Sequence, residues 1–301
     1  TYGIITGTGM GLGYGCVTPA ALKWFPPNKK GLISGLIVGG FGIAAVYYAP
    51  LMNVLLKNPN IGISKTFLYV GIAVTIISVF FGQFVKNPPA GYIPADVGEK
   101  AAATNKTVNF SWQEMLKTKQ FYLLFIVFFF ASSVGLMIVG NISKIASLQV
   151  GLSDAAWIVS ILAIFNTSGK VLGGLLSDKI GRVNTMIIIF LLQAVNMIAF
   201  PYYSTVKVLV IGVAIVGFAY GSLSSVFPSY VADAYGLKNY GMNYGIVYLA
   251  WGLSGVGAPL IADFIYDANH SFDNAYLISA IFMFLITGLA FVLKKAKLPV
   301  K

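Results

Sequence analysis

The sequence of 301 residues contains few charged side chains, one cysteine and one histidine. Only 10% of the residues are charged, whereas about a quarter are charged in a typical soluble domain. The low charge, with a hydrophobic content of 57%, excludes an ordinary water-soluble fold. Cys16 and His270 are too few for a disulfide framework or for a thiolate- or histidine-rich metal site. The sequence therefore predicts neither a metal nor a cofactor.

What the chain does contain is nine long apolar stretches. Each is about 18 to 26 residues long, close to the roughly 20 residues that cross a bilayer as a helix. We therefore expect an all-α polytopic membrane protein. The predicted spans are 1–22, 31–56, 66–85, 121–142, 155–176, 183–200, 208–229, 241–265 and 272–293.

The net charge of +11 comes from basic residues in the connections between these stretches. Of the 20 basic residues, fifteen lie in connections on one side of the predicted spans, four lie on the other side, and Lys170 lies inside a span. The positive-inside rule then puts Thr1 outside and Lys301 in the cytoplasm, with the chain in the inner or plasma membrane. Nucleic acid is not an expected partner, because no soluble module carries a clustered basic face.

The longest connection, 86–120, divides the spans into three and six. Its Pro88, Pro89 and Gly91 predict a cytoplasmic linker, and the capping box from Ser111 to Glu114 predicts a short helix. We expect a remnant of an N-terminal bundle at 1–85 and a six-helix bundle at 121–301. Carriers are often built from six-span halves made of three-span repeats, so this is the pattern of a twelve-span protein lacking its first three.

The connection after the fifth span has the sequence GLLSDKIGR, residues 174–182. A helix-end carboxylate beside two cations can hold neighbouring helices and release them during a conformational change, although an ordinary polar turn is the alternative. The segment resembles the G-x-L-a-D-r-x-G-R loop of the major facilitator superfamily, which implies that superfamily's fold. The predicted gating residues are Gly174, Asp178, Lys179, Gly181 and Arg182.

Several further segments resemble the oxalate/formate antiporter family and the related monocarboxylate transporters. They are GLGY at 11–14, KWFP at 23–26, KGL at 30–32, GLMI at 135–138 and the Phe227-Pro228 pair. The resemblance implies that the visible spans are numbers four to twelve. It also implies a secondary transporter that works by alternating access, as a monomer in the bilayer, and is not an enzyme.

Lys170 lies inside the apolar span 155–176, at roughly 12 Å of helix rise from Asp178. A lysine at the centre of a membrane helix costs roughly 2.5 to 3.5 kcal/mol, so a compensating interaction is expected. Its helix neighbours include the polar Asn166 and the small Gly173. This stripe predicts the wall of a water-filled cavity that receives an anion. A lysine that extends to the lipid headgroups is the alternative.

In the family that the sequence resembles, a basic residue on the eighth span meets the substrate carboxylate, which implies this role for Lys170. Asn166 stands where monocarboxylate transporters commonly carry an aspartate for proton coupling, and Trp251 aligns with a second cation of the oxalate-exchanging branch. A dicarboxylate facing one cation would keep an unpaired buried charge. We therefore expect a monocarboxylate such as formate, lactate or pyruvate. Coupling to a proton or to a counter-anion stays open.

Aromatic and hydroxyl side chains inside other spans complete the predicted substrate site. For each of them, helix packing is the alternative, most of all for Phe41 and Ser224. A carrier for a sugar or drug, or a non-transporting sensor on the same scaffold, is the alternative function. The candidates are Tyr14, Phe41, Tyr220, Ser224, Tyr248 and Trp251.

Overall fold

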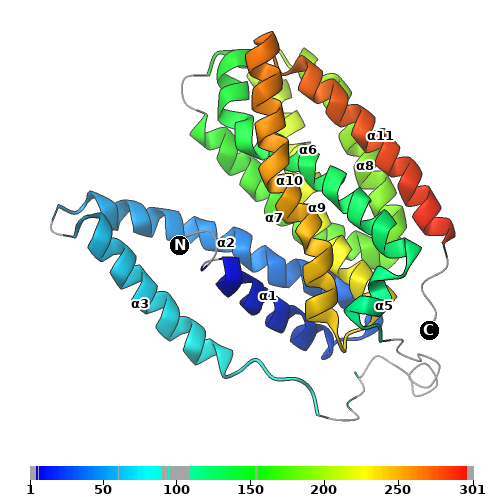
Figure 1. Cartoon of the computed structure of the whole chain (residues 1–301). Coiled ribbons are helices and arrows are strands. Elements are labelled where there is room, and N and C mark those ends of the chain that lie inside the picture. Colours follow the sequence, from blue (N-terminus) through cyan, green and yellow to red (C-terminus); the bar gives the residue numbers. More distant parts are fainter. Residues whose placement is uncertain are drawn as a thin grey trace.

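The computed structural model describes residues 5, 7–59, 61–89, 92, 94, 109–152 and 155–296. Every regular element in these ranges is a helix (Figure 1), and each predicted span overlaps one of them. Two groups are connected through the predicted linker. The first contains α1 (Gly7–Leu22), the short η2 (Pro27–Lys29), α2 (Lys30–Lys57) and α3 (Gly62–Gly82).

The second group is a bundle of six long helices that follows the short α5 (Trp112–Leu116). α5 has the predicted capping box: the hydroxyl of Ser111 accepts a hydrogen bond from the Glu114 backbone, and the Ser111 backbone donates to the Glu114 carboxylate. The bundle contains α6 (Lys119–Val150), α7 (Ala156–Ile180), α8 (Arg182–Ala199), η3 (Phe200–Tyr202), α9 (Val206–Tyr235), α10 (Tyr240–Asn269) and α11 (Asp273–Lys295).

The lengths and composition of the helices match a membrane environment. Seven of the described helices, α3 and α6 to α11, are long and apolar enough to cross a bilayer. Large apolar side chains such as Phe264 (75% exposed) and Val195 (61% exposed) lie on the outside of the molecule, where lipid would cover them. The fold is therefore that of an all-α polytopic membrane protein, as the sequence predicts.

Helix α6 continues eight residues beyond its predicted span, to Val150. Polar residues such as Asn141 and Lys144 end the apolar stretch, but they do not end the helix, because their backbone groups keep helical hydrogen bonds. The helix stops at Gly151, whose φ of 69° lies in the left-handed region that glycine adopts without a side-chain clash. Hydropathy therefore locates the membrane segment better than the helix end.

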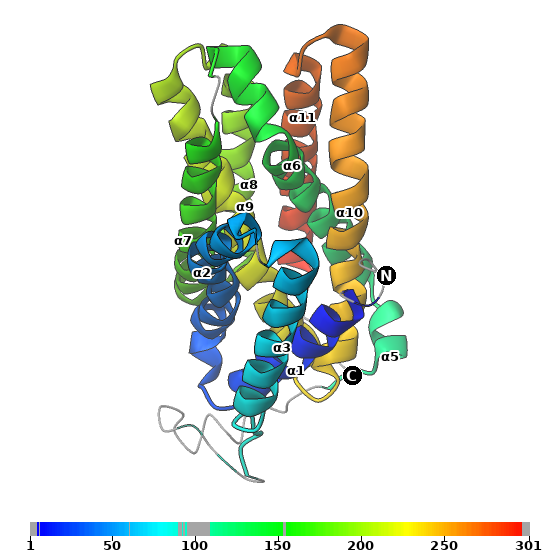
Figure 2. The ribbon, with the colours of Figure 1, turned by 90° about the vertical axis from the view of Figure 1, so that its left-hand side faces the viewer.

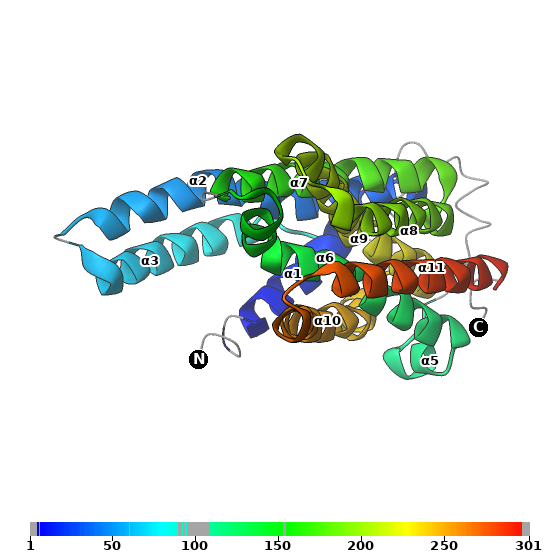
Figure 3. The ribbon, with the colours of Figure 1, turned by 90° about the horizontal axis from the view of Figure 1, so that it is seen from above.

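Within the six-helix bundle, α7 packs along α9, α6 packs against α10, and α8 packs against α11. Aromatic rings fill its centre, as where Phe128 of α6 stacks on Phe227 of α9 with ring centroids 4.1 Å apart. The α1 to α3 group contacts this bundle mainly through α2, which packs on α7 and α9. Figures 1 and 3 show that α2 and α3 extend away from the bundle beyond this contact, and in Figure 2 they lie in front of it. The two groups therefore converge at one end and diverge towards the other.

Candidate functional site

The first turns of α2 touch the end of α7 without intervening side chains. A Cβ atom built on Gly174 of α7 would collide with the carbonyl oxygen of Gly31, and one built on Gly35 of α2 would collide with the carbonyl oxygen of Lys170. Only glycine at these positions lets the two backbones come so close. The predicted gating loop thus lies where the two groups of helices meet.

The carboxylate of Asp178 caps the start of α2. It accepts hydrogen bonds of 2.8 Å from the backbone N–H groups of Gly31 and Leu32, which are among the unpaired donors that every helix start presents. Arg182 donates to the same carboxylate. Asp178 and Arg182 have 8% and 9% of their side-chain surface exposed, so these contacts are buried. The interaction joins α2, α7 and α8.

Two further charges complete this arrangement, which we call the charge cluster: Lys30, Asp178, Arg182 and Asp233. Asp233 of α9 accepts from the Nε of Arg182 at 3.0 Å and from the Nζ of Lys30 at 2.8 Å. Sequence reasoning missed Asp233. The available signal was a carboxylate within an apolar helix, which has to find a cation to be tolerated there.

The other residues of the predicted loop have different roles. Gly181 forms the turn between α7 and α8 with a φ of 92°, a conformation that a residue with a side chain rarely adopts. Lys179 is exposed, and its side chain belongs to none of the ion pairs found in the described residues. The turn therefore needs Gly181 for its shape, while the cluster forms without Lys179.

Lys170 lies two turns before Asp178 on α7 and is half-buried. Its helix neighbours Asn166 and Gly173 contact α9, and its neighbours Thr167 and Gly174 contact α2. Lys170 is therefore on the stripe of α7 between these two contacts, away from exposed apolar residues such as Ile164. Its ammonium forms no hydrogen bond or ion pair with any residue that the structure describes.

Asn166, one turn earlier, packs against α9. Its amide lies 3.5 Å from the carbonyl oxygen of Gly217, at the limit of a hydrogen bond. A Cβ on Gly221 would collide with the carbonyl oxygen of Asn166. Close packing of α7 on α9 therefore fixes the helix turn from which Lys170 projects.

Phe41 of α2 lies two turns beyond Ser34 on the same helix face. Ser34 is fully buried and accepts a hydrogen bond of 3.2 Å from the hydroxyl of Ser229 on α9. Phe41 is 54% exposed, although the next residue, Gly42, packs on α7, where an added Cβ would collide with the hydroxyl of Thr167. The Ser34–Ser229 contact thus joins α2 to α9, one turn after the start of α2.

Three of the predicted aromatic residues form one contact group, the aromatic cluster of Tyr220, Tyr248 and Trp251. The indole N–H of Trp251 donates a hydrogen bond of 2.7 Å to the hydroxyl of Tyr220. Tyr248 stacks on Trp251 with ring centroids 5.0 Å apart and an interplanar angle of 16°. The ring of Tyr220 lies against Gly135 of α6, where an added Cβ would collide with it. The cluster therefore joins α6, α9 and α10.

Two predicted candidates remain outside this cluster. Ser224, one turn after Tyr220 on α9, is half-buried. Tyr14 belongs to α1, but its side chain lies outside the part of the chain that the structure describes. Both therefore remain predictions.

These features define a polytopic membrane protein whose two groups of helices meet through a partly buried charge cluster at one end. The model of the Major Facilitator Superfamily matches residues 135–301. The oxalate:formate antiporter of Oxalobacter formigenes is 30% identical over 308 residues, which cover 99% of this chain and 70% of that protein. The chain therefore belongs to the Major Facilitator Superfamily of transporters.

Two further comparisons extend this assignment. Monocarboxylate transporter 12 of Xenopus laevis is 23% identical over 99% of this chain and 69% of its own length. A crystal structure of the E. coli fucose:proton symporter FucP superposes with a TM-score of 0.70 at 12% identity, covering 95% of this chain and 74% of that chain. At this identity the structural match shows the fold alone.

Proposed function

We propose that the protein is a secondary transporter that moves a small monocarboxylate across the membrane by alternating access. The observation that carries the proposal is the ammonium of Lys170, which lies on an apolar helix between the contacts with α2 and α9 and has no partner among the described residues. Such a charge costs roughly 2.5 to 3.5 kcal/mol at the centre of a membrane helix. A bound carboxylate would offset this cost by pairing with it.

The aromatic cluster supports a small anion with one negative charge. Tyr220, Tyr248 and Trp251 offer apolar ring surface and hydroxyl groups but no second cation. A dicarboxylate would keep one charge unpaired, whereas formate, lactate or pyruvate would be neutralised by Lys170. Relatives that are named an oxalate:formate antiporter and a monocarboxylate transporter support this substrate class.

The charge cluster supports the alternating-access part of the proposal. Its hydrogen bonds hold α2 to α7, α8 and α9, so passage at that end requires these contacts to separate. The excess of lysine in the connections at that end supports a cytoplasmic location for it, together with Lys301. We propose that 1–85 and 121–301 move as two bodies, which the segment 86–120 links.

The test is uptake of labelled formate, lactate and pyruvate into liposomes that contain the purified full-length protein. Replacing Lys170→Gln should reduce carboxylate uptake at least tenfold, because the neutral amide has no charge to pair with the substrate. Lys170→Arg should keep measurable uptake, since the guanidinium also pairs with a carboxylate. Lys179→Gln, an exposed lysine on the same helix, is the matched control.

Two results would contradict the proposal. Unchanged carboxylate uptake in Lys170→Gln would remove Lys170 from the site. Uptake of fucose or glucose, without any carboxylate uptake by the unmodified protein, would assign a different substrate class. Liposomes preloaded with unlabelled carboxylate, compared with liposomes under a proton gradient, distinguish exchange for a counter-anion from symport with a proton.

A further inference from the structure

A buried glutamine beside the aromatic cluster has no hydrogen-bond partner. Gln193 of α8 is 2% exposed, and neither its amide nitrogen nor its amide oxygen is paired with a described residue. Transfer of an amide to apolar surroundings without a compensating hydrogen bond costs roughly 2 to 7 kcal/mol. A polar ligand should therefore meet this side chain.

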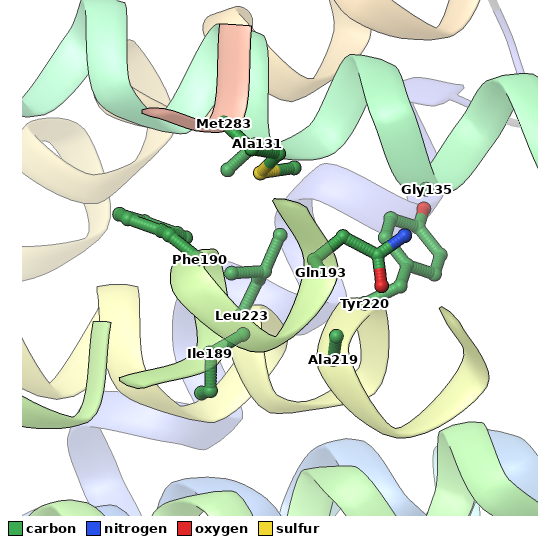
Figure 4. Close-up of a pocket in the computed structure, with 9 residues that line it drawn as sticks. All are labelled: Ala131, Gly135, Ile189, Phe190, Gln193, Ala219, Tyr220, Leu223 and Met283. Carbon is green, nitrogen blue, oxygen red and sulfur yellow. The ribbon is translucent and has the colours of Figure 1, made fainter. Parts of the chain in front are cut away.

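The amide lies beside a small void between α6, α8, α9 and α11 (Figure 4). The void has a volume of about 10 Å³, which is near the space that one water molecule needs. Its polar lining comes from Gln193 and Tyr220, and Figure 4 shows the amide of Gln193 on the side where Tyr220 lies. Apolar side chains such as Ile189 and Met283 line the rest. This chemistry suits one water molecule and no larger ligand.

Tyr220 has capacity for a further hydrogen bond. Its hydroxyl accepts from Trp251 at 2.7 Å, and a phenol can also donate one hydrogen bond. No acceptor for that proton occurs in the ranges that the structure covers. A water in the void could accept it while bonding to the amide of Gln193, which would satisfy both groups.

We propose that one buried water, held by Gln193, hydrogen-bonds to Tyr220 and fixes the orientation of the Tyr220–Trp251 pair. Gln193 is then a positioning residue, since it acts on the aromatic cluster through the water and does not touch the substrate. The expected effect on transport rests on the proposed function, because the Tyr220–Trp251 pair lines an anion site only under that proposal. The water itself is independent of what the protein carries.

Radiolytic hydroxyl-radical labelling of the purified full-length protein tests for the water, because a buried residue is labelled only where water lies beside it. Met283, 2% exposed, and Tyr220 should be labelled in the unmodified protein. Gln193→Met, which has similar size without hydrogen-bonding groups, should lower this labelling at least fivefold. Ile189→Val, a change in the same lining that keeps the amide, should leave it unchanged.

Fluorescence of Trp251 tests the positioning role without any substrate. The chain has four tryptophans, so the background Trp24→Phe, Trp112→Phe and Trp157→Phe leaves Trp251 as the reporter. Gln193→Met should shift its emission maximum, and Ile189→Val should not. In transport, Gln193→Met should raise KM several-fold with little change in kcat.

The outcomes separate this proposal from the proposed function. The water site would be overturned if Met283 is not labelled in the unmodified protein, or if it is labelled equally in the unmodified protein and in Gln193→Met. If Gln193→Met loses the labelling as expected but the emission maximum of Trp251 does not shift, the positioning role is overturned. Both measurements remain readable if Lys170→Gln transports normally, since neither uses a substrate.

Discussion

Asp178 and Lys170 lie on the same helix, roughly 12 Å apart along its axis, and have opposite surroundings. The carboxylate of Asp178 accepts from two backbone N–H groups of α2 and from Arg182. The ammonium of Lys170 forms no such contact with the described residues. Removal from water is costly for both charges, but within the part of the chain that the structure describes only the charge of Asp178 is compensated by protein groups.

The difference indicates two roles for charge within one membrane helix. A fully paired charge such as Asp178 holds helices together and has little to gain from a ligand. An unpaired charge such as that of Lys170 would be stabilised strongly by pairing with a bound anion. α2 touches the helix at both levels, at Gly31 beside Asp178 and at Gly35 beside the carbonyl of Lys170. Separation of α2 from α7 would therefore change the surroundings of both.

The largest expected effect comes from preventing that separation. In a Cys16→Ser background, which removes the one cysteine of the chain, Ser34→Cys with Ser229→Cys places two thiols where hydroxyls lie 3.2 Å apart. A disulfide between them would hold α2 on α9. We expect oxidation to abolish uptake and a reducing agent to restore it, measured in the same liposomes.

The two single variants serve as controls for this lock, because neither can form the bond within one chain. They should transport equally under oxidising and reducing conditions. Full uptake by the double variant, with the disulfide shown by mass spectrometry, would mean that the charged end stays closed during transport.

A smaller effect should follow from weakening the contacts of Asp178, the paired charge of α7. Asp178→Asn removes the charge that Arg182 and the start of α2 share, which should cost the closed arrangement about 2 kcal/mol. That is roughly a thirty-fold change in an equilibrium constant. Ser34 is fully buried, so the labelling rate of Ser34→Cys by a maleimide reports opening. We expect this rate to rise by about that factor in Asp178→Asn.

Lys179→Gln is the matched comparison, since it removes an exposed charge from the same loop. The labelling rate should not change in this variant. If Asp178→Asn and Lys179→Gln behave alike, the buried hydrogen bonds of Asp178 contribute nothing to closure.

The fold was predictable from the sequence because a bilayer imposes a minimum apolar length on each span. The stretch 241–265, for example, lies within α10 (Tyr240–Asn269). Part of the loop 174–182 was recognisable because it acts through short-range geometry, as Gly181 does in its turn and as Asp178 does in its pairing with Arg182, four residues later. These features depend on neighbours in the chain, so the sequence expresses them directly.

Contacts between distant helices could not be read in the same way. Asp233 pairs with Arg182, 51 residues earlier, and no local pattern around Asp233 marks this partner. Tyr248 and Trp251 share a face of one helix because they are three residues apart, whereas the hydrogen bond from Trp251 to Tyr220 depends on how α9 and α10 pack. Gln193 is visibly polar within an apolar stretch, but only the packing around it shows that its amide lacks a partner.

The smallest expected effect concerns substrate preference at the aromatic cluster. Trp251→Lys would add a cation to a site whose other charge is Lys170, at the position that the family resemblance aligns with a second basic residue. The inhibition constants of oxalate and formate against labelled formate uptake measure the preference. Their ratio should move several-fold towards oxalate, because a dicarboxylate would then pair both of its charges.

Trp251→Met isolates the contribution of the new charge, since it also removes the ring that stacks on Tyr248 and the donor to Tyr220. Both variants should weaken formate binding through that shared loss. Only Trp251→Lys should change the ratio, because only it adds charge. If the ratio is the same in both variants, the cation at residue 251 does not reach the substrate, and the aromatic cluster then packs helices without lining the anion site.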